Sequence, residues 1–214
     1  MPVRHPPMTI YELKPRFQAL LRPLARALYD VGVTANQVTL AACFLSVLLG
    51  IVLCLGVQHR ALCLLLPVWL ALRMALNAID GMLACEFGQK SDVGAFLNEL
   101  TDVVSDAALY LPFAFLPLFG WLEVAGVILL AALWEMTGVV AVMIGASRRY
   151  DRPVGKSERA FVLGALGLAV GLGLAPAAWQ RAIFPAVALL LCLTIVNRVR
   201  RGLARAADHA QARP

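Results

Sequence analysis

The stretch NAIDGMLACEFGQKSDVGAFLNELTD, from Asn77 to Asp102, places a series of polar side chains between two long apolar segments, at about 61–84 and 94–118. The polar and small residues follow steps of three and four, which is the spacing of one helical face. These residues are Arg73, Asn77, Asp80, Gly81 and Ala84 in the first segment, and Gly94, Asn98, Asp102 and Asp106 in the second, with Glu99 beside them. The stretch therefore predicts two helices joined by a short link, with their polar faces meeting at one end.

The composition is that of an integral membrane protein. Of the 214 residues, 61% are hydrophobic and 15% are charged, and the mean hydropathy is +0.78. A soluble domain carries about 25% charged residues. Six apolar segments have about the length that a hydrocarbon core of ~30 Å requires of a helix. They lie at about 37–57, 61–84, 94–118, 122–146, 158–175 and 178–197. We expect an all-α fold, a six-transmembrane-helix bundle in a lipid bilayer.

The basic residues predict the orientation of the bundle. All but three of the 19 Lys and Arg residues lie in the N-terminal segment, the two longer links or the C-terminal tail. The exceptions are Arg60, Arg73 and Arg181. Because cytoplasmic loops carry the excess of Lys and Arg, both termini are expected in the cytoplasm. The net charge of +6 is thus a topology signal that could also hold anionic headgroups, and we expect no nucleic acid as a partner.

Three parts of the chain are expected. Residues 1–35 are expected to form a cytoplasmic interfacial amphipathic segment, which Pro15 and Pro23 would divide into a helix pair. Residues 36–198 are expected to form the six-span domain and 199–214 a basic cytoplasmic tail, with the chain after Asn197 fraying into water. The first residues do not resemble a cleaved signal peptide, and the start could be Met1 or Met8.

The two polar faces predict chemistry at a membrane surface. Carboxylate and amide oxygens that converge from two helices suit Mg²⁺ or Mn²⁺. A divalent cation beside a spare carboxylate is what transfer of a phosphoryl-type group needs, since the carboxylate can take a proton from an attacking hydroxyl. The alternative is that these side chains only join helices by hydrogen bonds. Ionisable groups inside a membrane are costly, which favours the functional interpretation.

The spacing resembles the signature of the CDP-alcohol phosphatidyltransferase family, D-x-x-D-G-x-x-A-R, eight residues, then G-x-x-x-D-x-x-x-D. The matching positions are Asn77, Asp80, Gly81, Ala84, Cys85, Gly94, Asn98 and Asp102. The resemblance implies a homodimer of six-span protomers with both termini inside. It also implies transfer of a phosphatidyl group from CDP-diacylglycerol to an alcohol acceptor, with release of CMP. Asn77, Asp80, Asn98 and Asp102 would then hold the metal, with Asp102 as the base, while Gly81, Ala84 and Gly94 would admit the substrate.

Two further segments resemble short motifs of the same family. TANQVTL places Asn36 and Thr39 where the family holds the nucleotide, and VGKSERA places Lys156 where it meets phosphate. Each motif has a plain alternative, because Asn-x-x-Thr is also typical of a helix cap and a loop Lys is usually solvated. Arg159, one turn beyond Lys156, is a candidate for binding an anionic acceptor.

Three positions depart from the family signature. Asn77 and Asn98 stand where it has Asp, and Cys85 stands where it has Arg. An Asn offers an oxygen but no charge, so the site would bind divalent metal less tightly and hold one ion or two. Glu99, Asp106 or Glu86 could compensate. The chain is similar to a divergent bacterial inner-membrane branch of the family that has Asn at both positions.

The sequence thus predicts a divalent-metal-dependent phosphatidyltransferase of the bacterial inner membrane, with its acceptor unidentified. The departures leave open a non-catalytic descendant that binds lipid or nucleotide and supports a partner enzyme. Two roles are equally open for Arg73, which could form a buried ion pair with Glu135 or reach toward Asp80.

Overall fold

The computed structural model describes residues 10–144, 155–174 and 178–211. Within these residues the chain forms seven α-helices and two short 3-10 helices, with no strand. They are α1 (Ile10–Asp30), α2 (Ala35–Leu55), η1 (Arg60–Leu64), α3 (Leu65–Glu86), α4 (Asp92–Tyr110), η2 (Leu111–Phe115), α5 (Trp121–Met143), α6 (Lys156–Gly171) and α7 (Ala178–Gln211). The expectation of an all-α protein is confirmed. Met1 and Met8, the two candidate starts, lie outside the described residues.

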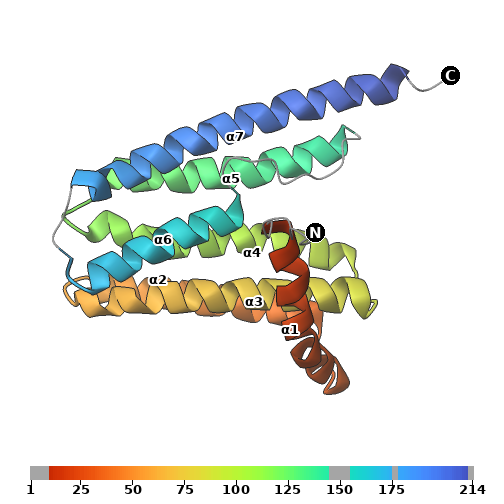
Figure 1. Cartoon of the computed structure of the whole chain (residues 1–214), viewed down its shortest axis with the longest axis horizontal. Helices are drawn as coiled ribbons and strands as arrows, with labels where there is room; N and C mark the ends of the chain where they lie inside the picture. Colours follow the sequence, from red (N-terminus) through yellow and green to blue (C-terminus); the bar gives the residue numbers. More distant parts are fainter. Residues whose placement is uncertain (1–9, 145–154, 175–177, 212–214) are drawn as a thin grey trace, which may run out of the picture.

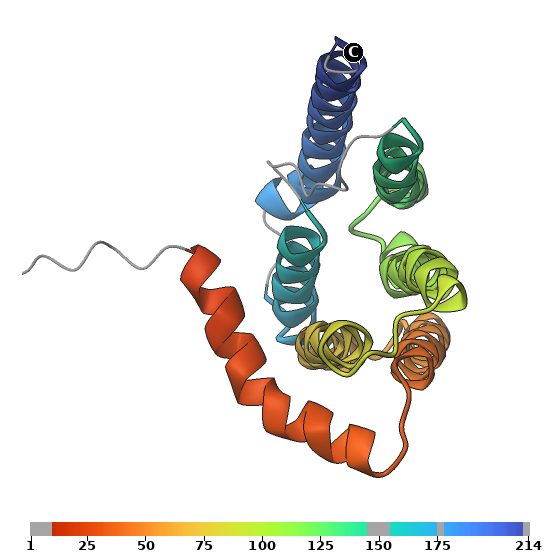
Figure 2. The same cartoon turned by 90° about the vertical axis from the view of Figure 1, so that its right-hand side faces the viewer.

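Helices α2 to α7 form one bundle, and α1 lies across its end. Figure 1 shows the six bundle helices with roughly parallel or antiparallel axes. In the end-on view of Figure 2, α1 instead runs across the page beside α3. Helix α2 packs on α3 and α4, α3 packs on α6, and α5 packs on α4 and α7. The helices that carry the polar stretch therefore lie between α2 on one side and α5 and α6 on the other.

Glycines bring the helices of the polar stretch close to their neighbours. A Cβ on Gly50 of α2 would collide with the carbonyl oxygen of Ala108 in α4. A Cβ on Gly167 of α6 would lie 3.0 Å from the side chain of Leu66 in α3. Small residues at such contacts let membrane helices approach backbone to backbone. This close packing fixes how α2, α3, α4 and α6 face one another at the site.

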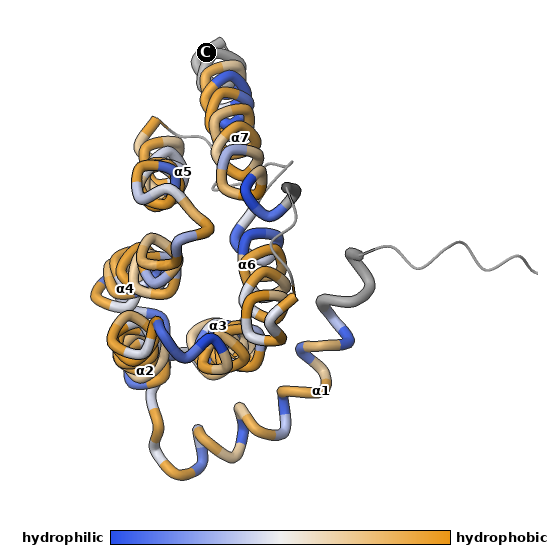
Figure 3. Tube along the Cα trace, turned by 90° about the vertical axis from the view of Figure 1, so that its left-hand side faces the viewer, coloured by the Kyte–Doolittle hydropathy of each residue, from blue (hydrophilic) through white to orange (hydrophobic). Residues whose placement is uncertain are grey.

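The described part of the chain contains four helical segments long and apolar enough to cross a membrane. They are Ala35–Leu55, Arg60–Glu86, Trp121–Met143 and Gln180–Arg205. Figure 3 shows that most residues along these helices are hydrophobic. Helix α4 differs because it carries four acidic residues, and α6 because only 16 residues of it are helical. The protein is therefore an α-helical membrane protein with several spans.

The N-terminal segment corrects one expectation. Helix α1 runs through Pro15 and Pro23 as one continuous helix rather than as a pair. It is held at the end of the bundle by apolar packing of its Ala25 against α2 and α3. The Arg22 guanidinium donates to Glu86 from Nε at 2.8 Å and from Nη2 at 2.9 Å, and these bonds raise the pKa of Arg22. Tertiary contacts thus keep the helix whole across residues that favour a break.

The C-terminal segment also differs from what was expected. We expected the chain after Asn197 to fray into water, but α7 continues as a helix to Gln211. This continuation is rich in Ala, Arg and Leu, which are strong helix formers. A fall in hydropathy therefore marks the end of the apolar segment and not the end of the helix.

Candidate functional site

The start of α2 and the link between α3 and α4 are tied together by local hydrogen bonds. Thr34 caps α2 by accepting from Gln37 N at 3.3 Å, and Gln37 Oε1 accepts from Thr34 N at 2.9 Å. Ser91 caps α4 by accepting from Gly94 N at 3.0 Å. In the link itself, Gln89 Oε1 accepts from Ala35 N at 2.7 Å. The beginnings of α2 and α4 and the end of α3 are therefore held at one end of the bundle.

The Asn-x-x-Thr motif meets the first part of the signature. Thr39 donates from Oγ1 to Asp80 Oδ2 at 2.8 Å, and both residues are buried. A Cβ on Gly94 would lie 2.7 Å from Asn36 Oδ1, so the Asn36 side chain lies against the start of α4. Since Thr34 is the cap of α2, Asn36 and Thr39 are not needed for capping. The structure brings both residues to the signature.

Small residues leave room beside Asp80. A Cβ built on Gly81 would meet nothing within 4 Å. Ala84, one turn further along α3, is half-buried, and Cys85 is exposed. Asn77 is half-buried one turn before Asp80 on the same helix. This part of α3 offers two oxygen-bearing side chains next to open space.

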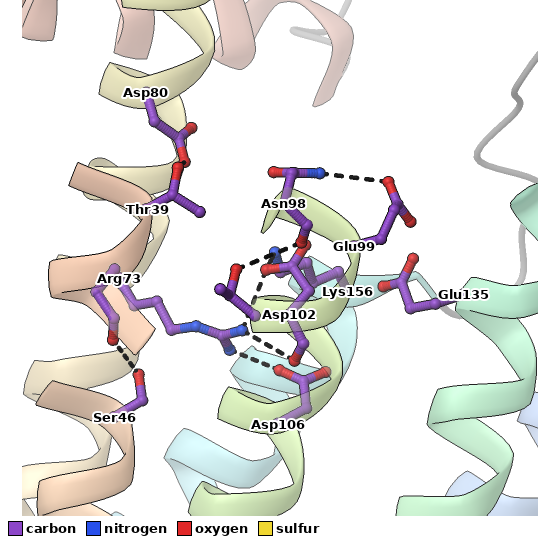
Figure 4. Close-up of polar contacts among 12 residues, drawn as sticks. Thr39, Ser46, Arg73, Asp80, Asn98, Glu99, Asp102, Asp106, Glu135 and Lys156 are labelled. Atoms are coloured by element: carbon purple, nitrogen blue, oxygen red, sulfur yellow. Dashed lines mark hydrogen bonds and ion pairs between the residues drawn. The ribbon is translucent and has the colours of Figure 1, made fainter. Parts of the chain in front are cut away.

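Asp102 lies between two cations from other helices. Lys156, the first residue of α6, forms an ion pair with Asp102 Oδ1. Arg73 Nη2 of α3 lies 3.3 Å from the same oxygen. The side chains of Asp102 and Lys156 are 13% and 24% exposed, whereas that of Arg73 is 5% exposed. Figure 4 shows these side chains converging on α4, and water or a ligand can reach the site from the side of Lys156.

One turn deeper, Asp106 is enclosed by donors. Arg73 Nη1 donates to its Oδ1 at 2.5 Å, Arg159 Nη2 donates to its Oδ2 at 3.0 Å, and Tyr110 OH donates to its Oδ2 at 3.2 Å. Asp106 is 4% and Arg159 0% exposed. We call these four residues the buried charge network. Because both Asp106 oxygens already accept hydrogen bonds from residues of neighbouring turns and helices, Asp106 serves helix packing and is not available to replace a missing metal ligand.

The network corrects the suggested pair between Arg73 and Glu135. Arg73 binds Asp102 and Asp106, whereas the nearest described cation to Glu135 is Arg159, at 3.8 Å from Nη2 to Oε1. Arg159 was expected near the cytoplasmic surface, but it points into the bundle. Its binding to an acceptor stays a prediction, and such an acceptor would have to reach a covered side chain.

Neither Tyr110 nor Trp134 was predicted from the sequence to belong to the site. Tyr110 lies four residues after Asp106, so helical spacing could have placed the two together. The ring of Trp134 lies between two guanidinium groups, 4.8 Å from Arg159 Cζ and 4.5 Å from Arg198 Cζ. No local pattern signals this arrangement, because it joins α5, α6 and α7.

The predicted metal ligands Asn77, Asp80, Asn98 and Asp102 are side chains of the kind that bind hard divalent cations. Among the residues that the structure describes, no three His, Cys, Asp or Glu side chains form a metal-binding group, because two of the four positions are Asn. The amide of Asn98 donates from Nδ2 to Glu99 Oε1 at 3.4 Å, and Figure 4 shows its oxygen turned toward Asp80. The ammonium group of Lys156 already lies on Asp102 as a cation would. Two carboxylates with amide oxygens are a donor set that Mg²⁺ and Mn²⁺ accept.

The basic link before α6 lies outside the described residues. It contains Arg148, Arg149 and Arg152.

Comparison with known proteins identifies a family and several relatives of this chain. The family model described as CDP-alcohol phosphatidyltransferase matches residues 32–196. The chain is 46% identical over 201 residues to the inner membrane protein YnbA of Escherichia coli K12, covering 94% of this chain and 100% of that protein. It is 27% identical over 149 residues to the archaetidylinositol phosphate synthase of Pyrococcus horikoshii, covering 66% of this chain and 76% of that protein.

Solved structures of a Mycobacterium tuberculosis phosphatidylinositol phosphate synthase share the fold. The crystal structure with bound CDP-DAG has a TM-score of 0.68 at 20% identity and covers 84% of this chain and 92% of that one. The crystal structure with manganese and citrate has a TM-score of 0.69 at 19% identity and covers 85% of this chain and 88% of that one. The family model spans most of this chain and includes all the signature positions. The protein belongs to the CDP-alcohol phosphatidyltransferase family.

Proposed function

We propose that the protein moves a phosphatidyl group from CDP-diacylglycerol to an alcohol acceptor and releases CMP. The observation that carries the proposal is the convergence at one end of the bundle. There Thr39 donates a hydrogen bond to Asp80, Lys156 pairs with Asp102, and a Cβ on Gly81, the residue after Asp80, would meet nothing within 4 Å. Carboxylates for a cation, a lysine for phosphate and room for a ligand are the parts that this transfer needs.

The reaction is a displacement at phosphorus. The acceptor oxygen attacks the phosphorus that carries the diacylglycerol oxygen, and its proton passes to Asp102. A new phosphorus–oxygen bond forms as the bond from that phosphorus to the bridging oxygen of the diphosphate breaks. CMP leaves with that oxygen and the electron pair of the broken bond. Lys156 exchanges its pair with Asp102 for a phosphate oxygen of the donor, which frees Asp102 to accept the proton.

Asp80 and Asp102, with the amide oxygens of Asn77 and Asn98, would hold Mg²⁺ or Mn²⁺. The ion supplies positive charge that stabilises the diphosphate oxygens as the leaving group departs. The mycobacterial relative was crystallised with CDP-DAG and, separately, with manganese. These two ligands of a protein with the same fold support the choice of donor and cofactor for this chain.

The proposal includes the membrane arrangement. Six helices, α2 to α7, cross the bacterial inner membrane, with both termini in the cytoplasm and the site at the cytoplasmic surface. The inner-membrane name of the Escherichia coli relative supports this location. The acidic residues of α4 face partners from α3 and α6, which lowers their cost within a membrane. The homodimer implied by the family stays a prediction that light scattering of the purified protein can measure.

The experiment is a product search. Purified full-length protein in lipid nanodiscs receives CDP-diacylglycerol, Mg²⁺ or Mn²⁺ and a pool of alcohol acceptors. The proposal predicts CMP together with a new phospholipid whose mass identifies the acceptor. Folded protein that releases no CMP with any acceptor or either metal would contradict the proposal.

A second candidate is a non-catalytic protein that binds lipid or nucleotide through the inherited site. It is favoured by the three departures at Asn77, Asn98 and Cys85, which remove two negative charges and one positive charge from the signature. Restoring all three residues, as Asn77→Asp, Asn98→Asp and Cys85→Arg, separates the two candidates. Activity in the restored protein alone would favour the second candidate, and activity in the unmodified protein would exclude it.

A further inference from the structure

Three buried polar groups around Arg159 lack hydrogen-bond partners within the described chain. They are Nε and Nη1 of Arg159 and Nε1 of Trp134. Arg159 and Trp134 are both 0% exposed. Glu135, which is 7% exposed as a whole residue, likewise has no hydrogen bond among the described residues, since its nearest described cation is 3.8 Å away. Donors and an acceptor therefore lie unpaired in one small region between α5 and α6.

This region adjoins the proposed reaction centre. Side-chain exposure falls from 24% at Lys156 to 13% at Asp102, 9% at Glu135 and 0% at Arg159. Figure 4 shows the Glu135 side chain directed from α5 toward Lys156 and α4. A ligand that enters beside Lys156 would thus meet Asp102 first and Glu135 next, with Arg159 below.

None of the other groups that the structure describes forms a hydrogen bond with Glu135. Arg159 Nη2, its nearest cation, already donates to Asp106 at 3.0 Å. The Arg159 guanidinium also lies over the Trp134 ring, with Cζ 4.8 Å from the ring centroid. A buried polar group without a hydrogen bond costs about 1–3 kcal/mol, and several together are rare in folded proteins. A bound polar molecule would remove this cost.

We infer that Glu135, Arg159 and Trp134 form the binding site for the acceptor, and that this acceptor is a neutral polyhydroxyl alcohol. A hydroxyl is both donor and acceptor, so one can donate to Glu135 while another accepts from Arg159 or Trp134. A phosphate group could accept from Arg159, but it would lie beside the carboxylate of Glu135, and like charges at such a distance cost several kcal/mol. An amino alcohol with a single hydroxyl would use that hydroxyl for the attack, and its ammonium group could not accept from Arg159.

The inference deepens the proposed function, on which it rests, because it identifies the class of acceptor and the residues that select it. One hydroxyl of the polyol lies at Asp102 as the attacking group. The others bind Glu135 and Arg159 and hold the attacking oxygen in place.

The test compares two probes that differ by one phosphate, glycerol and sn-glycerol 3-phosphate. CMP release from CDP-diacylglycerol is measured with each probe in the unmodified protein, Glu135→Gln and Glu123→Gln. Glu123 is a matched control, because it is an exposed glutamate in the first turn of the same helix. Glutamine at position 135 keeps the size and one acceptor oxygen of the side chain, so the fold should persist, and thermal unfolding checks this.

We expect the unmodified protein to have a kcat/KM for glycerol at least about tenfold above that for glycerol 3-phosphate. Glu135→Gln should raise the KM for glycerol by about tenfold, with kcat and the KM for CDP-diacylglycerol changed by less than about threefold. Glu123→Gln should leave kcat and both KM values unchanged. A preference for glycerol 3-phosphate, or an unchanged KM for glycerol in Glu135→Gln, would overturn the inference while leaving the proposed function intact.

A binding measurement decides the inference even without turnover. Protein labelled with 5-fluorotryptophan is titrated with glycerol and followed by ¹⁹F NMR, with the Trp134 signal assigned by its loss in Trp134→Phe. A saturable shift of the Trp134 signal that is absent in Glu135→Gln supports the acceptor site. If this shift is seen but CMP is never released, the proposed function fails and the acceptor site stands. No shift in the unmodified protein overturns the site.

Discussion

Asp102 and Asp106 lie one turn apart on α4, yet their surroundings differ. Asp102 faces the open end of the bundle and pairs with Lys156, whose side chain is 24% exposed. Asp106 accepts hydrogen bonds from two buried arginines and from Tyr110. Arg73 contacts both carboxylates and joins the two regions.

The difference indicates that the two carboxylates of α4 have different roles. A carboxylate with an exposed lysine as partner can exchange that partner for a substrate or a cation. A carboxylate enclosed by buried donors cannot change partners without leaving charges unpaired. We therefore propose that Asp102 takes part in the reaction and that Asp106 stabilises the bundle, and the variants below test both roles.

Asp106→Ala should have the largest effect, on stability. It leaves Arg73 and Arg159 without their shared partner, and breaking a buried pair in this way costs about 3–5 kcal/mol. Chemical unfolding in detergent micelles measures the loss. Asp92→Ala, an exposed acid in the first turn of the same helix, is the control. A loss for Asp106→Ala no larger than that of the control would refute the structural role.

Asp80→Asn should lower CMP release about 100-fold or more, because it removes one of the two carboxylates left in the signature. The fold should persist, since asparagine can still accept from Thr39. Activity is measured across Mg²⁺ concentrations. Activity within about threefold of the unmodified protein at every concentration would exclude Asp80 from the proposed cation site.

Lys156→Gln should raise the KM for CDP-diacylglycerol about tenfold, because a charge-assisted contact with phosphate is worth about 1.5 kcal/mol or more. Stability should change little, since the ion pair is partly exposed. Lys90→Gln, in the exposed link between α3 and α4, is the matched control. Equal effects of the two substitutions would mean that Lys156 contributes only general positive charge.

Thr39→Val should have the smallest effect, a fall in CMP release of about fivefold. The substitution keeps the shape of the side chain but removes one hydrogen bond to Asp80, which is worth about 1 kcal/mol. Thr137→Val serves as control, because the Thr137 hydroxyl donates to a carbonyl of its own helix at 2.8 Å. Normal activity in Thr39→Val would show that Asp80 is held without it.

Much of the helical architecture could be predicted from hydropathy. The segment expected at about 37–57 is α2, Ala35–Leu55, and that expected at about 61–84 is η1 with α3. The steps of three and four placed Asp102 and Asp106 on one face of α4, where the structure has them. Helix period and apolar length are local properties, so the sequence carries them directly.

The partners of the buried charges could not be predicted in the same way. Arg73 was a candidate partner for Glu135, but Arg159 lies nearer to Glu135 because α6 packs against α3 through its glycines. Which arginine meets which carboxylate depends on this packing, and single-sequence periodicity does not encode it. The same limit applies to α1, where contacts with α2 and α3 outweigh the local effect of Pro15 and Pro23.

The central claim is that Asp102 takes part in phosphatidyl transfer. Its most direct test measures CMP release from CDP-diacylglycerol, with Mg²⁺ and pooled alcohol acceptors, for the unmodified protein and Asp102→Asn in the same nanodisc preparation. We predict metal-dependent release that Asp102→Asn abolishes while its unfolding midpoint stays near that of the unmodified protein. Equal CMP release by the two proteins would contradict the account.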